Sequence, residues 1–234
     1  KFYYSILCSV IGDIIGYGNG SIEFNYGHDM KVSSQKDIQR LSGLSVLHVC
    51  NFIKDGGIIK YDPSKEIVSD DTILILATLD ALIDSYNKSD DEIIDTIKKY
   101  MIKYYLNDKN KNKRNYGIRT VKSLLRISEG KDWNKWAYSD HAGGSGASMR
   151  SMPIGLIYHG KKNREKLIYI SIMSSKITHN NPIGYLGGLA SALFTALAFE
   201  EVDKNKWVYE LLDILKTDYF KKIISKITKN FPED

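Results

Sequence analysis

The chain has 234 residues, of which 43% are hydrophobic and 26% charged, and its formal net charge at pH 7 is +5. This length and composition favour one folded domain with a large core, and they exclude an intrinsically disordered chain. The basic excess is mostly scattered lysine, a pattern that usually serves solubility, so we expect no nucleic-acid binding.

The sequence predicts a succession of helices joined by polar loops. Apolar residues recur at helical spacing in several long stretches, and only four prolines interrupt the chain. Residues 21–68 are mixed, and residues 107–114 form a polar, charged connector. An apolar segment with a proline in its first turn covers residues 152–158. The expected helices cover residues 2–15, 69–86, 89–106, 118–127, 164–173, 182–199 and, as one or two helices, 208–228.

Two of these helices carry further predictions. Helix 182–199 is dense in glycine and alanine, so its backbone can approach neighbouring helices closely and we expect it to be central. Because no strand pair and no internal repeat is recognisable, the fold is predicted to be all-α, compact and a single domain over residues 1–234. Helix 69–86 is expected to point seven apolar residues inward, namely Ile73, Leu74, Leu76, Ala77, Leu79, Leu82 and Ile83.

The cysteines and the apolar runs bear on location. Cys8 and Cys50 lie at no metal-binding or disulfide spacing, which favours a reducing compartment, and we expect a cytoplasmic monomer. No apolar run reaches the roughly 18 residues of a membrane-spanning helix, so no membrane segment is predicted. The chain lacks an initiator methionine and Asp13 interrupts its first apolar stretch, so the numbering is expected to begin inside a longer protein.

A Ser-Asp-Asp tripeptide occurs twice, at residues 69–71 and 89–91, each time at the predicted start of a helix. Because serine and acidic residues favour a helix N-terminus, the tripeptide alone indicates only a helix cap. The first copy is followed by Thr72 and an apolar run, whereas the second is followed by Glu92 and a lysine-rich helix. Adjacent carboxylates flanked by hydroxyls are the hard oxygen ligands that Mg²⁺ prefers. Only the first copy is therefore a candidate metal site.

A glycine-rich stretch at residues 143–148 precedes Met149 and Arg150. It contains neither a P-loop nor a dinucleotide-binding pattern. Small residues allow backbone N–H groups to approach an anion, and a helix N-terminus follows, which together suit a diphosphate. The alternative is a flexible turn, although the apolar segment directly after the stretch argues against a simple linker.

Two further polar residues are ambiguous by themselves. His179 lies in a polar turn before helix 182–199 and could bond a ribose or phosphate oxygen, but a lone histidine is more often a structural residue. Glu23 lies in a loop after the first helix, where a single glutamate is usually solvated. Glu23 becomes a candidate catalytic residue only if the fold brings it to Asp70 and Asp71.

Four segments, taken in order, resemble one family. They are residues 12–17 with 19–20 and 23–24, residues 68–72 running into 76–78, residues 143–156, and residues 178–196. Their order and spacing resemble the ADP-ribosylglycohydrolase family. The fourth segment and the loop around residues 19–24 are most similar to its ADP-ribosylarginine hydrolase branch, whose members remove ADP-ribose from arginine side chains.

The resemblance implies an all-α fold, a two-Mg²⁺ centre and ADP-ribosylated proteins as substrates. It implies three groups of site residues. Ser69, Asp70 and Asp71 match the first metal-ligand motif, and Asp70 and Asp71 are also candidate catalytic groups. Glu23 matches an acidic loop residue that assists catalysis. The residues implied in binding ADP-ribose are Gly144, Ser145, Gly146 and Met149 at the diphosphate and distal ribose, His179 in the pocket, and Tyr17 and Asn19 beside Glu23.

One departure from the family pattern concerns the metal site. The family carries a later Asp-x-Asp-Ser/Thr motif that supplies the other half of the ligands. No such motif follows His179 in this chain, since Asp203, Asp213 and Asp218 each lack a second aspartate two residues away. The sequence therefore leaves three hypotheses: a hydrolase whose remaining ligands lie outside this chain, a non-catalytic ADP-ribose-binding protein, and a basic helical nucleic-acid binder supported only by the charge.

Overall fold

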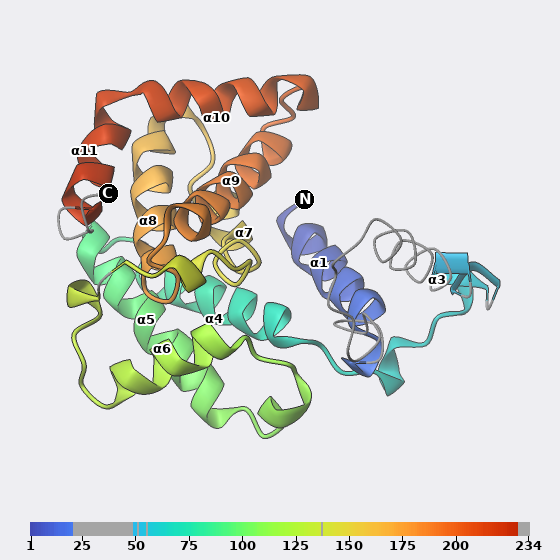
Figure 1. The fold of residues 1–234 in the computed structure, drawn as a ribbon. Coiled ribbons are helices and arrows are strands. Elements are labelled where there is room, and N and C mark those ends of the chain that lie inside the picture. The colour runs from blue at the N-terminus through green and yellow to red at the C-terminus, as the bar shows by residue number, and fades with distance from the viewer. Residues whose placement is uncertain (21–48, 51, 55, 137, 229–234) are drawn as a thin grey trace, which may run out of the picture.

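The computed structural model describes residues 1–20, 49–50, 52–54, 56–136 and 138–228, and its regular elements in these ranges are all helical (Figure 1). The all-α prediction is therefore confirmed. The α-helices in the described ranges are α1 Phe2–Tyr17, α3 Gly57–Lys60, α4 Asp70–Asp84, α5 Asp90–Asn107, α6 Ile118–Ser128, α7 Met152–Ile157, α8 Arg164–Lys176, α9 Pro182–Phe199, α10 Trp207–Lys216 and α11 Asp218–Thr228.

The helix boundaries follow the local signals in the sequence. Helix α1 ends at Gly18, whose left-handed backbone (φ 51°) suits a residue without a side chain. Helix α9 has the predicted bounds, with Pro182 in its first turn and Asn181 as its N-cap. Helix α8 runs to Lys176 instead of ending at Met173 as predicted. The C-terminal stretch forms two helices, α10 and α11, which was one of the two options.

The core lies where the pair α4 and α5 meets α7, α8 and α9 (Figure 1). One prediction for α4 is wrong, because the side chain of Ile83 is 60% exposed while that of Ile75 is buried. Ile83 lies one turn after the exposed Asp80 and shares its solvent-facing side, whereas Ile75, Leu79 and Leu82 recur at the spacing of a buried stripe.

Helix α9 is the central helix, as its small residues predicted. A Cβ atom added to Gly188 would lie 2.0 Å from Ser175 Oγ of α8, and one added to Gly155 of α7 would lie 2.1 Å from the carbonyl oxygen of Ala192 in α9. The prediction that no apolar run has membrane-spanning length is wrong, because the 18 residues of α9 are long and apolar enough. The close contacts with α7 and α8 identify α9 as a core helix.

The close contact between α7 and α9 leads to a prediction about the stability of the fold. The substitution Gly155→Ala is expected to lower the free energy of unfolding by about 1–3 kcal/mol, because the added methyl group meets a backbone oxygen that has no room to move. Chemical denaturation measures the effect. Gly187→Ala on α9 adds the same methyl group at 3.6 Å from Ser148, an ordinary contact, and is expected to leave stability unchanged or slightly raised. Equal stability of the two variants would contradict the packing argument.

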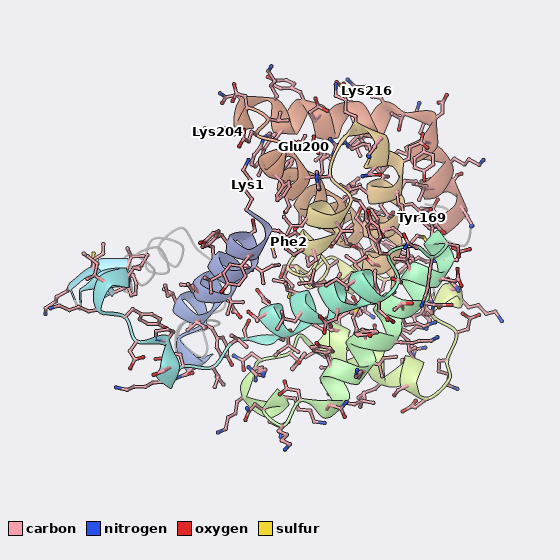
Figure 2. The ribbon with its side chains drawn as sticks, turned by 180° about the vertical axis from the view of Figure 1, so that it is seen from behind. Lys1, Phe2, Tyr169, Glu200, Lys204 and Lys216 are labelled. Atoms are coloured by element: carbon pink, nitrogen blue, oxygen red, sulfur yellow. The ribbon has the colours of Figure 1, made fainter. Side chains whose placement is uncertain are left out.

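Buried and surface ion pairs hold the outer helices to this core. Arg164 at the start of α8 bonds Glu200 at the end of α9 at 3.1 Å, and both side chains are less than one-fifth exposed. Lys1, the N-cap residue of α1, pairs with Glu201, which lies two residues after the end of α9. Figure 2 shows Lys1 and Glu200 on the side of the molecule where α1 approaches α9. The start of α1 therefore lies next to the end of α9.

Candidate functional site

The first Ser-Asp-Asp copy begins α4 and acts as a helix cap. The Ser69 hydroxyl accepts a hydrogen bond from the Asp71 amide at 3.1 Å, as an N-cap residue does. Asp70 is only 4% exposed, which is unusual for an aspartate that serves only as a first-turn charge. The cap interpretation is therefore correct but incomplete, and the further contacts of these residues decide what else they can do.

Asp13 of α1 lies directly on this cap and was not among the predicted site residues. Its Oδ1 accepts a bond from Ser69 Oγ at 2.6 Å, and its Oδ2 accepts bonds from the Ser69 amide at 3.0 Å and from Thr72 Oγ1 at 2.5 Å. The available signal was a charged residue inside an otherwise apolar helical stretch, which the sequence analysis used only to argue against a signal peptide.

The proximity of Asp13 changes the electrostatics of Asp71. Burial, and next to it the negative charge of Asp13, raise the pKa of Asp71 from its usual value near 4 to about 6. A carboxyl group with a pKa near neutrality can accept or release a proton at physiological pH. Positive charge at this point would be stabilised by both carboxylates.

The second Ser-Asp-Asp copy lacks these features. Ser89 and Glu92 form a reciprocal capping box, in which each side chain bonds the other residue's backbone amide. Asp91 accepts a hydrogen bond from Tyr169 of α8 at 2.7 Å, so it joins α5 to α8. The second copy is therefore a structural helix start, as predicted, and it provides a matched control for the first.

The connector between α5 and α6 positions the start of α4. Arg114 forms a salt bridge with Asp108 at 2.9 Å, with both side chains largely buried, and donates to the Val68 carbonyl at 2.5 Å. The Asp70 amide donates to the Arg114 carbonyl at 3.1 Å, and the Gly117 amide donates to Asp70 Oδ2 at 3.3 Å. Asp70 is thus fixed against the N-terminus of α6, whose positive dipole end favours a carboxylate.

The glycine-rich stretch forms a tight series of turns before α7. The Ser145 carbonyl accepts from the Met149 amide at 3.1 Å and from Ser148 Oγ at 2.8 Å. Gly144 and Ser145 are exposed on its outer side. A Cβ atom on Gly146 would lie 2.7 Å from His179 Cε1, so the turn needs glycine there. His179 and the glycine-rich turn are therefore in direct contact, as their joint assignment to one pocket requires.

Arg150 is a buried anchor for this turn. Its side chain is 2% exposed and donates to the carbonyls of Gly146 and Ser174, the latter at 3.0 Å, and to Thr178 Oγ1 at 2.8 Å. Burial lowers the pKa of Arg150 to about 9, and the charge of Asp70 acts in the opposite direction. Arg150 therefore stays protonated at neutral pH and lies within the electrostatic reach of Asp70.

His179 is held neutral behind the turn. Burial first, and then the positive charges of Arg150 and Arg119, lower the pKa of His179 to about 3. Its Nδ1 lies 2.7 Å from Thr178 Oγ1. Donation of the Thr178 hydroxyl proton to Nδ1 leaves Nε2 as the N–H group of the neutral ring. An Nε2–H beside Gly144 and Gly146 is a donor suited to a ligand oxygen.

The depressed pKa of His179 predicts a specific acid sensitivity. Since the folded-state pKa lies below the unfolded value near 6.5, the unfolded chain binds the proton more strongly, and stability is lost as the pH falls below about 6.5. The substitution His179→Gln is expected to reduce this loss by about 1 kcal/mol per pH unit between pH 6 and 4. Denaturation at several pH values measures the slopes. An unchanged slope in His179→Gln would contradict the prediction.

Tyr17 and Asn19 close the end of α1 against neighbouring loops. The Tyr17 hydroxyl donates to the Lys113 carbonyl, and Asn19 Oδ1 accepts from the Ile67 amide at 2.7 Å. Both residues line a pocket of about 430 Å³. Glu23, which these residues are predicted to accompany, lies outside the described residues.

The oxygen groups at the start of α4 fit part of a magnesium site. Mg²⁺ is typically bound by one or two carboxylates together with waters and substrate oxygens. Ser69, Asp70 and Asp71 offer such groups, and Asp13 adds a further carboxylate that bonds Ser69. Among the residues that the structure describes, no group of three or more His, Cys, Asp or Glu side chains is placed to hold a metal ion.

Helix α6 connects the acidic motif to the glycine-rich turn. Its first residues reach Asp70 through the Gly117 amide, and Thr120 lies one turn further along, 3.1 Å from the position of a Cβ on Gly146. The predicted metal ligands and the predicted diphosphate turn thus lie on either side of one helix N-terminus. The contact is indirect, but it joins sequence segments that are about 75 positions apart.

Comparisons with known proteins identify the family of the chain. The model of the ADP-ribosylglycohydrolase family matches residues 1–231. A protein of Acanthamoeba polyphaga mimivirus is 34% identical over 94% of this chain, and its name assigns it as an ADP-ribosyl glycohydrolase. The ADP-ribosylhydrolase ARH1 of Dictyostelium discoideum is 32% identical over 89% of it. The chain spans 41% and 50% of the lengths of these two relatives. The chain belongs to the ADP-ribosylglycohydrolase family.

Proposed function

We propose that the protein containing this chain hydrolyses the N-glycosidic bond between ADP-ribose and protein arginine, in a reaction that depends on Mg²⁺. The observation that carries the proposal is the double contact of α6, whose start meets Asp70 on one side and the Gly146 turn with His179 on the other. Carboxylates linked through one helix to a turn of small residues suit a hydrolase of ADP-ribose linkages. The 32% identity to a protein named ADP-ribosylhydrolase ARH1 supports the reaction class.

In the proposed reaction each residue has a defined task. Ser69, Asp70 and Asp71 would hold Mg²⁺, which would supply electrostatic stabilisation and orientation of the substrate hydroxyls. Asp71 accepts a proton from the attacking water, and Glu23, which follows α1 in the sequence, assists. Water forms a bond to the anomeric carbon as the bond from that carbon to the guanidinium nitrogen breaks with oxocarbenium-like character. The electron pair of the broken bond goes to the nitrogen, and the departing guanidine takes up the proton that Asp71 accepted from water.

The binding tasks fall to the glycine-rich turn. The amides of Gly144, Ser145 and Gly146 face the diphosphate, and the Nε2–H of His179 donates to a ligand oxygen. Met149 sits at the inner end of the turn, where its amide closes the turn onto Ser145. Tyr17 and Asn19 hold the end of α1 against Lys113 and Ile67.

Release of ADP-ribose from arginine-modified protein tests the proposal. The intact protein is expected to release ADP-ribose with Mg²⁺, to stop when EDTA is added, and to recover when excess Mg²⁺ is restored. Protein modified through a different side chain serves as the comparison substrate for the linkage. A folded, intact protein that releases no ADP-ribose from arginine in the presence of Mg²⁺ would end the proposal.

A second candidate is a non-catalytic ADP-ribose-binding protein. It is favoured by one observation, namely that the described residues contain no group of three metal-ligating acidic or histidine side chains. Calorimetric titration with ADP-ribose separates the two candidates when it is combined with the hydrolysis assay. Binding of ADP-ribose without turnover, at every Mg²⁺ concentration, supports the second candidate. In either case ADP-ribosylated proteins are the proposed partners of a monomeric chain.

A further inference from the structure

The two Ser-Asp-Asp copies differ at the third residue of the helix that each begins. In the second copy this position holds Glu92, which closes a capping box within α5. In the first copy it holds Thr72, which has no carboxylate to reach back to the N-cap. Helix α4 therefore cannot form a capping box by itself, and the carboxylate that bonds Ser69 comes from another element.

Asp13 of α1 takes the place that Glu92 has in the second copy. Glu92 Oε2 accepts from the Ser89 amide at 3.0 Å and from Ser89 Oγ at 2.6 Å. Asp13 accepts from the Ser69 amide at 3.0 Å and from Ser69 Oγ at 2.6 Å. The distances are the same, but one carboxylate lies three positions from its serine and the other lies 56 positions away. Asp13 thus completes the capping box of α4 from a different helix.

Thr72 fixes the orientation of the Asp13 carboxylate. Its Oγ1 donates to Asp13 Oδ2 at 2.5 Å, while Asp13 Oδ1 takes the bond from Ser69 Oγ, so both carboxylate oxygens are engaged. Ser69 and Thr72 are buried, and hydrogen bonds to a charged group are strong where water is excluded. Asp13 therefore cannot turn away without leaving two buried hydroxyl groups unpaired.

The bonds of Ser69 decide what its hydroxyl group can offer to a cation. A serine hydroxyl has one proton and two lone pairs. The proton is donated to Asp13, and one lone pair accepts from the Asp71 amide at 3.1 Å. Within the described residues one lone pair of Ser69 Oγ remains, and the bond to Asp13 holds the proton away from it. Ser69 can therefore serve as an acceptor-only oxygen, the form that a divalent cation requires of a ligand.

We propose that Asp13 is a positioning residue for the metal site, which holds the Ser69 hydroxyl with its proton turned away so that Ser69 can bind Mg²⁺ together with Asp70 and Asp71. The inference rests on the magnesium site of the proposed function, but it does not require an arginine linkage. Because the carboxylate belongs to α1, docking of α1 and metal binding are coupled, and each favours the other. The second copy has no such coupling, since its carboxylate belongs to the same helix as its serine.

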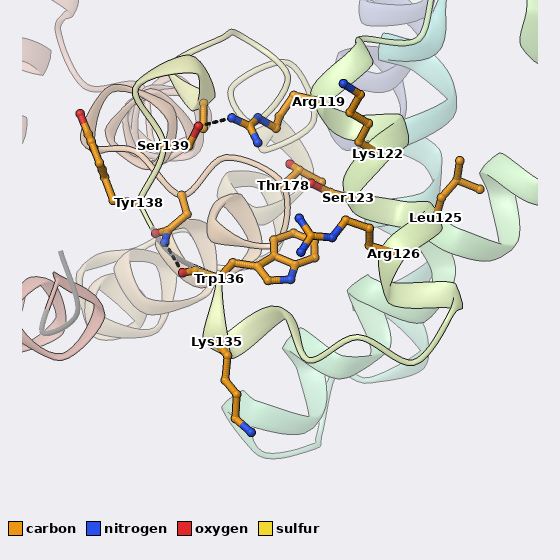
Figure 3. Close-up of a pocket in the computed structure, with 12 residues that line it drawn as sticks. Arg119, Lys122, Ser123, Leu125, Arg126, Lys135, Trp136, Tyr138, Ser139 and Thr178 are labelled. Atoms are coloured by element: carbon orange, nitrogen blue, oxygen red, sulfur yellow. Dashed lines mark hydrogen bonds between the residues drawn. The ribbon is translucent and has the colours of Figure 1, made fainter. Parts of the chain in front are cut away.

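A cationic pocket behind α6 provides a reporter that is separate from the cap of α4. The pocket has a volume of about 700 Å³, and Figure 3 shows Lys122 and Arg126 on its α6 side. The guanidinium of Arg126 lies 5.4 Å from the centre of the Trp136 ring. Asp13, Ser69 and Thr72 are not among the residues that line this pocket. Tryptophan emission therefore reports whether a substitution at the cap has disturbed the packing at α6.

Isothermal titration of the intact protein with MgCl₂, without substrate, tests the proposal. Asp13→Asn is expected to bind Mg²⁺ about 10–100-fold more weakly than the wild type, the usual effect of losing a group that orients a metal ligand. Glu92→Gln is the matched control, because it makes the same chemical change in the second capping box, and it should leave Mg²⁺ affinity unchanged. Tryptophan emission in EDTA that matches the wild type shows that each variant has kept its fold.

A double-mutant cycle separates positioning of Ser69 from a simple loss of negative charge. If Asp13 acts through the Ser69 hydroxyl, Asp13→Asn weakens Mg²⁺ binding much less in a Ser69→Ala background than in the wild type. If Asp13 acts only through its charge, the two losses of affinity multiply, and that result overturns the inference. Equal Mg²⁺ affinity in the wild type and Asp13→Asn overturns it as well.

Substitutions of Thr72 test the same arrangement without changing a charge. Thr72→Val removes one of the donors that hold Asp13, and Mg²⁺ affinity is expected to fall about 3-fold. Thr72→Ser keeps the hydroxyl group and should restore the wild-type affinity. This pair decides the question if Asp13→Asn fails to fold, and wild-type affinity in Thr72→Val then overturns the inference.

The hydrolysis assay keeps this inference distinct from the proposed function. If the variants lose Mg²⁺ affinity as expected but the wild type releases no ADP-ribose from arginine, the positioning role stands and the proposed function fails. If the wild type releases ADP-ribose but Asp13→Asn and Thr72→Val bind Mg²⁺ normally, the positioning role fails and the proposed function stands. A wild type that binds no Mg²⁺ overturns the positioning role and the magnesium dependence together.

Discussion

The substitution Asp71→Asn is expected to lower kcat for release of ADP-ribose from arginine by a factor of about 100 to 10,000, because it removes the group assigned to accept a proton. The substitution should not lower the free energy of unfolding. Burial and Asp13 raise the pKa of Asp71, so its charged form is the less stable one in the folded protein, and a neutral asparagine removes that disadvantage. Steady-state kinetics together with thermal unfolding in EDTA measure both effects.

The second Ser-Asp-Asp copy supplies the matched control for Asp71. Asp91 occupies the same position of the tripeptide but bonds Tyr169, away from the glycine-rich turn. Asp91→Asn is expected to leave kcat unchanged and to cost about 0.5–1 kcal/mol of stability through the weakened bond. If Asp71→Asn and Asp91→Asn have equal activity, the first tripeptide is only a helix cap and the assignment of Asp71 is wrong.

The substitution Arg150→Met is expected to lower the free energy of unfolding by about 3–5 kcal/mol. Methionine fills similar space but leaves three buried acceptors without their donor, namely the carbonyls of Gly146 and Ser174 and the hydroxyl of Thr178. The glycine-rich turn and His179 are both held by this side chain, so binding should fail along with stability. Chemical denaturation measures the loss of stability.

The conservative variant Arg150→Lys separates a positioning role from a purely structural one. Lysine keeps the charge but cannot reach three acceptors in a fork, so KM is expected to rise at least 10-fold while kcat changes little. Arg164→Met is the control, because it removes another largely buried arginine that pairs with Glu200 and lies away from the turn. It should lower stability and leave KM unchanged. An unchanged KM in Arg150→Lys would show that Arg150 does not position the turn.

Most of the helical framework was predictable from local signals. The glycine after α1, the serine caps of α4 and α5, and Pro182 at the start of α9 each act within a few residues of the boundary they set. The exposed Ile83 shows the limit of the same reasoning, because an apolar residue at the edge of a helical stripe can lie on either side. Which side it takes depends on the neighbouring helix.

The candidate site was only partly predictable for a related reason. The tripeptide at the start of α4 was recognised as a metal candidate, but Asp13, which bonds it, lies 56 positions away from Ser69. Arg150 was recognised only as the end of a motif, and its role follows from contacts with α8 and with Thr178, 28 positions further on. No local pattern in a sequence records which distant residue will meet a given side chain.

The sequence by itself determined the helices, their caps and the short turns, because backbone hydrogen bonds and side-chain periodicity act between residues near each other in the chain. It also carried the four segments whose order is shared with the family. Only the tertiary structure decided that Asp13 raises the pKa of Asp71, that α6 lies between the acidic motif and the glycine-rich turn, and that a cationic pocket opens behind it. Those properties depend on burial and on charges brought together by packing, and neither exists until the helices are assembled.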